Sequence, residues 1–330
     1  MRERDTLMNA LSRVLRSVEG VRNTRALGLL LGTFASAGLL VAMAEASSAR
    51  ADTWWGPLQA VLALLMAFYG GNAAGILVMD DARGGPVRDI GAALRVSLTT
   101  AHRLLLALAL VLGVVGVAAG AVLGLLWLSR AAVTGNVLGP LLFGLAVPIG
   151  VLTVGLGALA LVAVVVPLAA PGVWSGAGVC QIVTRLAALV RHRLLTVALL
   201  MAAVSLLTAG MGAVATFVVM VGGRVIAQLA VGVVGVLGVS GVSDIDAPAQ
   251  QLLAGLFGYG LRSLGATGAP AGASAHAAAA LVGGGVVFAL ALVLPGLVYL
   301  RGTCAVYLAM NDELRAPADP AADPGVAALR

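Results

Sequence analysis

Long stretches without a charged side chain constrain the fold of this chain more than any other feature. Six such stretches contain no Asp, Glu, Lys or Arg: Ala26–Ala44, Thr53–Met79, Leu104–Ser129, Ala131–Thr184, Leu194–Gly223 and Ala277–Leu300. A helix needs about 20 apolar residues to cross the roughly 30 Å hydrocarbon core of a bilayer. Each stretch is long enough, so the sequence predicts about six transmembrane helices.

The composition excludes a water-soluble globular protein. Only 10% of the 330 residues are charged and 61% are hydrophobic, whereas soluble domains carry about 25% charged residues. Lipid offers no partners for backbone N–H and C=O groups, so a chain that spans a membrane forms helices or a closed β-barrel. The six stretches lack the alternation of polar and apolar residues that barrel strands require. We therefore expect an all-α, polytopic membrane bundle.

The distribution of arginine predicts the orientation of the chain in the membrane. All 20 basic residues are arginine, which, together with abundant Ala, Gly and Val, is typical of a GC-rich bacterial genome. In a six-span topology, Arg50, Arg130, Arg224 and Arg262 fall on one side and the other sixteen arginines on the opposite side. Because cytoplasmic loops are enriched in basic residues, we expect a multi-pass protein of the bacterial inner membrane with both termini in the cytoplasm.

The segment 222–276 leaves the number of crossings open. Val225–Val242 is uncharged but carries several glycines together with Gln228 and Ser240. We interpret the segment as a non-cytoplasmic insertion that forms an interfacial or re-entrant hairpin. The alternative is a seventh span, which would move the C-terminus to the other side of the membrane.

A four-residue motif occurs twice, 90 residues apart, each time at the start of an uncharged stretch. His102-Arg103-Leu104-Leu105 aligns with His192-Arg193-Leu194-Leu195, and Arg95 aligns with Arg185. The shared spacing indicates that two parts of the chain have the same internal organisation.

An amphipathic pattern at helical spacing precedes each copy of the motif, over Asp89–Arg103 and Gly178–Arg193. A second match, at an offset of 231, aligns Gly71–Asp81 with Gly302–Asp312. We predict three repeats, about 1–83, 84–172 and 173–315, each an amphipathic helix followed by a two-span hairpin, within a single membrane domain 1–315. The Pro- and Ala-rich residues 316–330 are predicted to be a disordered cytoplasmic tail.

The basic residues around the motif are predicted to lie where surface helices meet the spans. Arginine side chains at that depth reach headgroup phosphates, and each basic residue adds about 1 kcal/mol of attraction to an anionic leaflet. Interfacial anchoring is the simplest interpretation, a site for anionic headgroups or other anions is the sharper one, and a proton relay through the histidines is a third. The candidate residues are His102, Arg103, His192, Arg193, Arg95 and Arg185.

The depth of Arg301 has two interpretations. If the last span ends at Leu300, Arg301 reaches up to the interface. If that span ends near Met310, Arg301 lies roughly 13 Å inside the membrane, where an arginine usually faces a partner or a water-filled cavity. With Asn72 and Tyr299 as possible neighbours, Arg301 is a candidate intramembrane polar site.

Patterns for catalysis and metal binding are missing from the sequence. Cys180 and Cys304 are isolated, and no nucleotide-binding, hydrolase or metal-ligand motif occurs. The acidic residues Asp80 and Asp81 at the end of a span can pair with arginines such as Arg88 or hold a cation. No basic patch with interleaved aromatic residues indicates nucleic-acid binding. We therefore expect no cofactor, no metal and no enzymatic activity.

The chain resembles uncharacterised bacterial six-span integral membrane proteins, and it is similar to the membrane domain that precedes some glycerophosphodiester phosphodiesterases. The resemblance rests on the amphipathic segments Asp89–Arg103 and Gly178–Arg193 and on Tyr299–Leu308, the aliphatic and aromatic end of the last span. No phosphodiesterase domain follows in this sequence, so the resemblance implies no activity.

The expected function is that of a non-enzymatic scaffold or subunit in the membrane. Its expected partners are the lipid bilayer, anionic phospholipid headgroups and other membrane proteins. The alternative is a transporter or channel for a small solute or a lipid, with a pathway along the repeat axis that Arg301 faces. A polar central cavity would favour transport, and a dry centre packed with Gly and Ala would favour the scaffold.

Overall fold

The structure is a computed structural model that describes residues 8, 11–49, 54–130, 135–236 and 275–315. The regular elements in this part of the chain are helical, and six helices are long and apolar enough to cross a membrane. The prediction of an all-α membrane protein with six candidate spans is therefore confirmed. Residues 237–274 of the predicted insertion and the predicted tail 316–330 lie outside the described residues.

The chain divides into two compact units. The first unit comprises Met1–Val18, Gly75–Ser205 and Leu300–Arg330, and the second comprises Glu19–Ala74 and Leu206–Tyr299. The elements in chain order are η1 (Arg16–Arg22), α2 (Thr24–Ala49), α3 (Trp55–Ala82), α4 (Ile90–Thr100), α5 (His102–Arg130), α6 (Gly135–Ala160), the π-helical turn η3 (Leu161–Val165), α7 (Val166–Trp174), α8 (Val179–Val236) and α10 (Ala275–Arg315).

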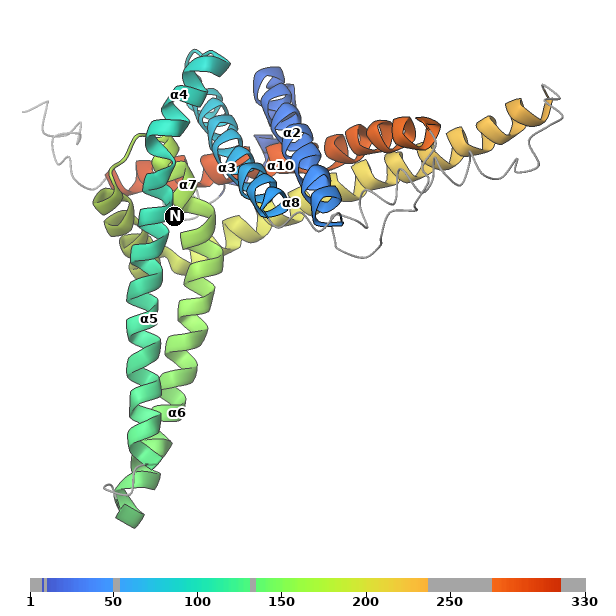
Figure 1. Ribbon diagram of the computed structural model, residues 1–330. Coiled ribbons are helices and arrows are strands. Elements are labelled where there is room, and N and C mark those ends of the chain that lie inside the picture. The colour runs from blue at the N-terminus through green and yellow to red at the C-terminus, as the bar shows by residue number, and fades with distance from the viewer. Residues whose placement is uncertain (1–7, 9–10, 50–53, 131–134, 237–274, 316–330) are drawn as a thin grey trace, which may run out of the picture. The chain divides into compact units, whose positions relative to one another are not determined.

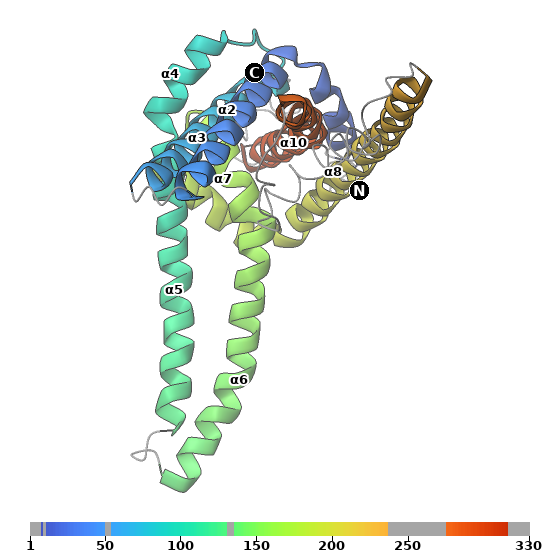
Figure 2. The same ribbon diagram turned by 45° about the vertical axis from the view of Figure 1, so that its right-hand side comes forward.

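Helices α5 and α6 form a long hairpin in the first unit (Figures 1 and 2). Large apolar side chains are exposed along both helices, among them Leu112, Leu123 and Leu152. A continuous apolar surface of this length marks a membrane contact rather than a water-exposed face. Through η3, α6 continues into α7, so the candidate span in this region ends at Trp174.

Two glycines allow the helices of the first unit to approach closely. A Cβ atom at Gly75 would collide with the ring of Trp174, and one at Gly302 would lie 2.6 Å from Cγ1 of Val204. Both positions therefore require a glycine. Small residues are common where the backbones of membrane helices pack closely against neighbouring helices. Around these contacts, the fully buried side chains include Ile76, Leu77, Met79, Leu168, Ile182 and Met310.

Both copies of the His-Arg-Leu-Leu motif lie at a break between a short helix and a long one. Helix α4 ends before Ala101, and α5 begins at His102. Helix α8 is interrupted at Arg193, whose backbone is non-helical with φ −138° and ψ 20°. A short helical segment precedes each break, and the candidate spans of these regions, Ile90–Ser129 and Val179–Gly223, include these segments.

The second unit contains a hairpin of α2 and the first part of α3 (Figure 2). Asn23 caps α2 by accepting a hydrogen bond from the Ala26 N–H at 3.1 Å. A Cβ atom at Gly70 would collide with Thr33, and Ser47 donates a hydrogen bond of 3.1 Å to Gln59. These contacts hold two candidate spans side by side.

The segment Val225–Val242, for which a hairpin and a seventh span were the alternatives, begins as a continuation of α8. The helix runs without a new start to Val236, and the candidate span that it contains is Val179–Gly223. The remainder of the segment belongs to the residues that the structure does not describe.

Candidate functional site

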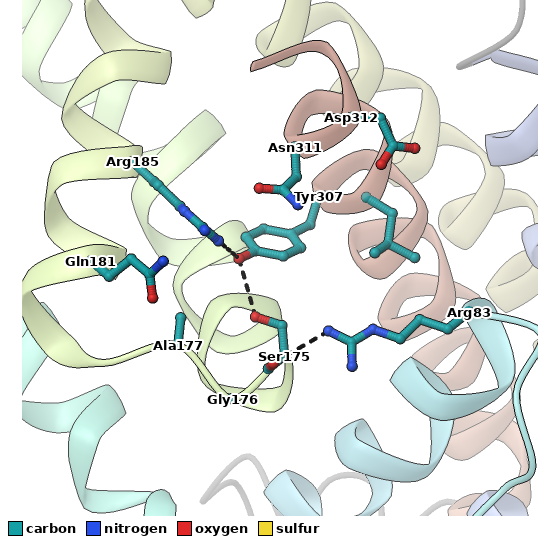
Figure 3. Close-up of a pocket in the computed structure, with 10 residues that line it drawn as sticks. Arg83, Ser175, Gly176, Ala177, Gln181, Arg185, Tyr307, Asn311 and Asp312 are labelled. Atoms are coloured by element: carbon teal, nitrogen blue, oxygen red, sulfur yellow. Dashed lines mark hydrogen bonds between the residues drawn. The ribbon is translucent and has the colours of Figure 1, made fainter. Parts of the chain in front are cut away.

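A polar pocket of about 350 Å³ lies in the first unit where several candidate spans end (Figure 3). Arg83 follows directly after α3, residues 175–177 connect α7 with α8, and the first turns of α8 contribute Gln181 and Arg185. The end of α10 contributes Tyr307, Leu308, Asn311 and Asp312. The pocket therefore lies at the ends of three candidate spans, which finish at Ala82, Trp174 and Asp312.

The turn between α7 and α8 shapes one wall of the pocket. The N–H of Ala177 donates to the carbonyl of Gly172 at 3.3 Å, and the N–H of Gly176 donates to that of Val173 at 2.9 Å. This pair of bonds is the Schellman arrangement, in which the residue after the helix takes a left-handed conformation. Gly176 has φ +86°, which a residue without a Cβ adopts at little cost. Four residues, 175–178, connect the end of α7 at Trp174 with the start of α8 at Val179.

A chain of hydrogen bonds crosses the floor of the pocket from α8 to α7. Arg185 Nη1 donates to the Tyr307 hydroxyl at 3.1 Å, and that hydroxyl lies 3.1 Å from Ser175 Oγ. Ser175 has a single O–H, which it donates to the carbonyl of Gly172 at 2.7 Å. Tyr307 must therefore be the donor to Ser175. Each hydrogen bond in the chain is then donated in the same direction, from Arg185 towards the end of α7. Such chains polarise their members and strengthen one another.

Arg83 reaches the same turn from the opposite side, as Figure 3 shows. Its Nη2 donates to the main-chain carbonyl of Ser175 at 3.3 Å. A cation at the C-terminal end of a helix is stabilised by the helix dipole and by the carbonyls that lack a partner in the helix. Arg83 is exposed, so the remaining donors of its guanidinium face the pocket and solvent.

Two consecutive acids at the end of α3 hold ion pairs next to the pocket. Oδ2 of the buried Asp80 lies 3.2 Å from Nε of Arg88. Arg301 on α10 pairs with Asp81, and both side chains are partly buried. The predicted pairing of the acidic residues with Arg88 is therefore present for Asp80.

The charges that line the pocket favour an anion. Among the described residues that line it, Arg83 and Arg185 carry positive charge and Asp312 carries negative charge, and Asp312 forms an exposed ion pair with Arg13 at 3.2 Å. The N–H groups of the first turn of α8 have no acceptor within the helix and add positive potential. Guanidinium groups suit phosphate because their planar N–H donors match its oxygens.

The structure separates the candidate residues of the sequence into three places. Arg185 lines the pocket, whereas His192 and Arg193 lie at the break in α8 and outside its lining. Arg95 is exposed on α4, and His102 and Arg103 begin α5. The contributors that sequence reasoning missed are Arg83, Ser175 and Tyr307, and the one local signal was the Ser-Gly-Ala-Gly turn at 175–178.

The three residues of the predicted intramembrane site have different surroundings. Arg301 is bonded to Asp81, and α10 continues past it to Arg315, which argues against a span that ends at Leu300. Asn72 and Tyr299 belong to the second unit. There the Asn72 amide is buried and donates to the carbonyl of Phe68 at 2.8 Å, within its own helix.

Within the described ranges, no group of three or more His, Cys, Asp or Glu side chains is arranged to hold a metal ion. Cys180 is exposed on the first turn of α8, and Cys304 is buried on α10. Neither cysteine lines the pocket. The chemistry that the pocket offers is therefore hydrogen bonding and positive charge.

Comparison with known proteins finds no matching family model, no similar curated protein and no similar solved structure. The resemblance to six-span bacterial membrane proteins therefore stays a prediction.

Proposed function

We propose that this chain is a non-enzymatic, multi-pass protein of the bacterial inner membrane, a scaffold or subunit whose polar pocket binds anionic lipid headgroups. The observation that carries the proposal is the pair Arg83 and Arg185, which line a pocket of about 350 Å³ at the ends of candidate spans. A lipid phosphate lies at this depth of a bilayer, directly beyond the hydrocarbon core. Basic pockets between transmembrane helices are a recurring form of lipid recognition.

Two contacts support a cytoplasmic location for both termini and for the pocket. Arg13, near the N-terminus, pairs with Asp312 at the end of α10. The ends of α3, α7 and α10 all contribute to one pocket, as expected if the second, fourth and sixth spans finish on the same side. Together with the excess of arginine on that side, this favours six crossings over seven.

The two helix breaks support the proposed organisation in repeats. The helix breaks lie at Ala101 and at Arg193. When the first break is shifted by 90 residues along the chain, the two breaks are two positions apart. Each break separates an amphipathic helix from a long apolar one. We propose that units of this kind, about 1–83, 84–172 and 173–315, arose as three copies of one pattern within a single domain.

The contacts of Arg301 favour binding over transport. In the alternative of a transporter or channel, Arg301 would face a pathway along the repeat axis. Its guanidinium instead donates to Asp81, so that its charge is already balanced. The pocket, rather than Arg301, is the place with available donors for an anion.

Calorimetric titration of the full-length protein in neutral detergent tests the proposal. The ligand is dioctanoyl phosphatidylglycerol, and the variants are Arg185→Gln and Arg83→Gln. A hydrogen bond to a charged group contributes about 1.5–3 kcal/mol, so each variant should bind about 10- to 100-fold more weakly.

The matched control is Arg191→Gln, which removes the same charge from an exposed position of the same helix outside the pocket. Its affinity should stay within about twofold of the parent protein, since exposed charges act weakly and are screened by salt. If Arg191→Gln weakens binding as much as Arg185→Gln, the lipid is attracted by the surface in general and the pocket is not its site.

A further inference from the structure

The pocket is larger than a phosphate group requires. Its volume of about 350 Å³ corresponds to about twelve water molecules, at roughly 30 Å³ each. A phosphate has five heavy atoms, so even at roughly 30 Å³ for each atom it fills less than half of that space. A ligand that occupies the pocket therefore brings further atoms into it, beyond its phosphate.

Side chains that bind hydroxyl groups also line the pocket. Gln181 on α8 and Asn311 on α10 line the pocket together with Asp312 (Figure 3). A carboxamide is both a donor and an acceptor, and a carboxylate accepts only. A hydroxyl group, which donates and accepts, matches this set, whereas an ester alkyl group would leave these polar atoms without a partner at a cost.

The charge of Asp312 restricts the second part of the ligand. A further anionic group would be repelled by this carboxylate, and its existing partner Arg13 balances it only from an exposed position. A hydroxyl donor stabilises the carboxylate without displacing Arg13. An ammonium group would compete with Arg13 for Asp312, and it could donate to the carboxamide oxygens of Gln181 and Asn311 but could not accept from their N–H groups.

We propose that the pocket selects a phosphate ester of a polyol, with the phosphate at Arg83 and Arg185 and the hydroxyl groups at Gln181, Asn311 and Asp312. Phosphoglycerol is the smallest headgroup of this class. The inference rests on the proposed function, because it assigns the rest of the ligand at the same anion site. The same chemistry occurs in a lipid headgroup and in a soluble polyol phosphate.

The test compares dioctanoyl lipids that differ only in the headgroup, titrated into the full-length protein in neutral detergent. Phosphatidylglycerol should bind about tenfold more tightly than phosphatidic acid or phosphatidylethanolamine, as two additional hydrogen bonds would give. If phosphatidic acid binds as tightly as phosphatidylglycerol, the polyol assignment is overturned while the anion pocket stands. If phosphatidylethanolamine binds most tightly, the hydroxyl assignment is overturned in favour of an ammonium group. If no lipid binds, the proposed function itself fails.

Two variants check the assignment of side chains. Asn311→Leu and Gln181→Leu should lower the affinity for phosphatidylglycerol to that for phosphatidic acid, and leave the affinity for phosphatidic acid within about twofold. Equal loss for both lipids would overturn the assignment. The comparison of lipids on the parent protein needs no variant, so it stands even where a variant fails to fold.

The water-soluble headgroup glycerophosphoglycerol separates the two sources of the ligand. If it displaces phosphatidylglycerol at comparable concentrations, the pocket recognises the polyol phosphate alone and a soluble ester satisfies it. If it displaces the lipid only at a 100-fold or greater excess, the acyl chains contribute and the source is the membrane. Failure of both the lipid and the soluble headgroup to bind would overturn the proposal.

Discussion

Replacing Tyr307 by Phe removes one hydroxyl group from the centre of the pocket, and its contacts set the size of the effect. The hydroxyl accepts from Arg185 and donates to Ser175, each at 3.1 Å, and the side chain is only 5% exposed. A neutral hydrogen bond contributes about 1 kcal/mol, and one with a charged partner about 1.5–3 kcal/mol. Water in the pocket can replace the bond to Arg185, so we expect a net loss of about 2 kcal/mol in the local stability of α10.

Cys304 provides the assay, because it is fully buried on α10 close to Tyr307. The chain has two cysteines, so a Cys180→Ser background leaves Cys304 as the reporter thiol. A buried thiol reacts with a soluble maleimide only when its surroundings open, and the rate then follows the free energy of local opening. A loss of about 2 kcal/mol should accelerate labelling about 30-fold.

The matched control for this prediction is Tyr299→Phe, the same change on the same helix outside the pocket. Its labelling rate should stay within about threefold of the parent. If Tyr307→Phe also stays within that range, the hydrogen-bond chain does not stabilise α10. If both variants accelerate labelling equally, the effect belongs to tyrosine hydroxyl groups on α10 in general, and the argument from the pocket is refuted.

Three further predictions follow from contacts and charge. Gly75→Ala should lower stability by about 1–3 kcal/mol, because its Cβ would collide with the Trp174 ring; Gly71→Ala, which meets open space, should be neutral or slightly stabilising in the same thiol-labelling assay. Gly302→Ala should also lower stability, by about 1–2 kcal/mol, because Val204 must shift to accommodate the added Cβ. Thermal unfolding in detergent measures this loss of stability. Raising NaCl from about 0.05 to 0.5 M should weaken calorimetric binding of phosphatidylglycerol several-fold by screening, and salt-independent binding would speak against an ionic site.

The sequence predicts the spans well where charges bound them and poorly where none do. The stretch that begins at Leu104 belongs to α5, which starts only two residues earlier at His102. By contrast, the uncharged stretch Ala131–Thr184 runs through a complete span, a reversal and the start of α8. The reversal depends on the left-handed backbone of Gly176 rather than on charge. Its signal was the cluster of Ser and Gly, which typically marks a turn.

The pocket was predictable in part, because repeated patterns contain Arg185 and the residues from Tyr307 to Asp312 but do not show that these residues meet at one place. Arg185 was a candidate through its match with Arg95. Its partner Tyr307 lies 122 residues further along the chain, and Tyr307 is 132 residues from Ser175. Contacts over such separations depend on how the helices pack, and no local spacing encodes them. Without the packing, Arg83 and Tyr307 are an ordinary arginine at a span end and an ordinary aromatic residue in a span.

The end of α3 connects the pocket with three other elements through closely spaced charges. Neighbouring residues on a helix point about 100° apart, so Asp80 and Asp81 cannot face the same partner. Asp80 pairs with Arg88 in the following loop, and Asp81 pairs with Arg301 on α10. Arg83 then reaches the turn after α7. We propose that these ion pairs, which do not line the pocket, help to position Arg83.

This dependence makes Arg301 a positioning residue, and its variants can be distinguished from those of the pocket. Arg301→Gln leaves the partly buried Asp81 without its cation and should lower stability by about 1–2 kcal/mol. We expect it also to weaken phosphatidylglycerol binding about threefold, through the altered position of α10 relative to Arg83. The double variant Arg301→Gln/Asp81→Asn should recover part of both losses, because a neutral pair leaves no unbalanced charge. Calorimetry measures the loss of binding, and Cys304 labelling measures the loss of stability. If the losses in the double variant equal the sum of those in the two single variants, the ion pair does not support the pocket.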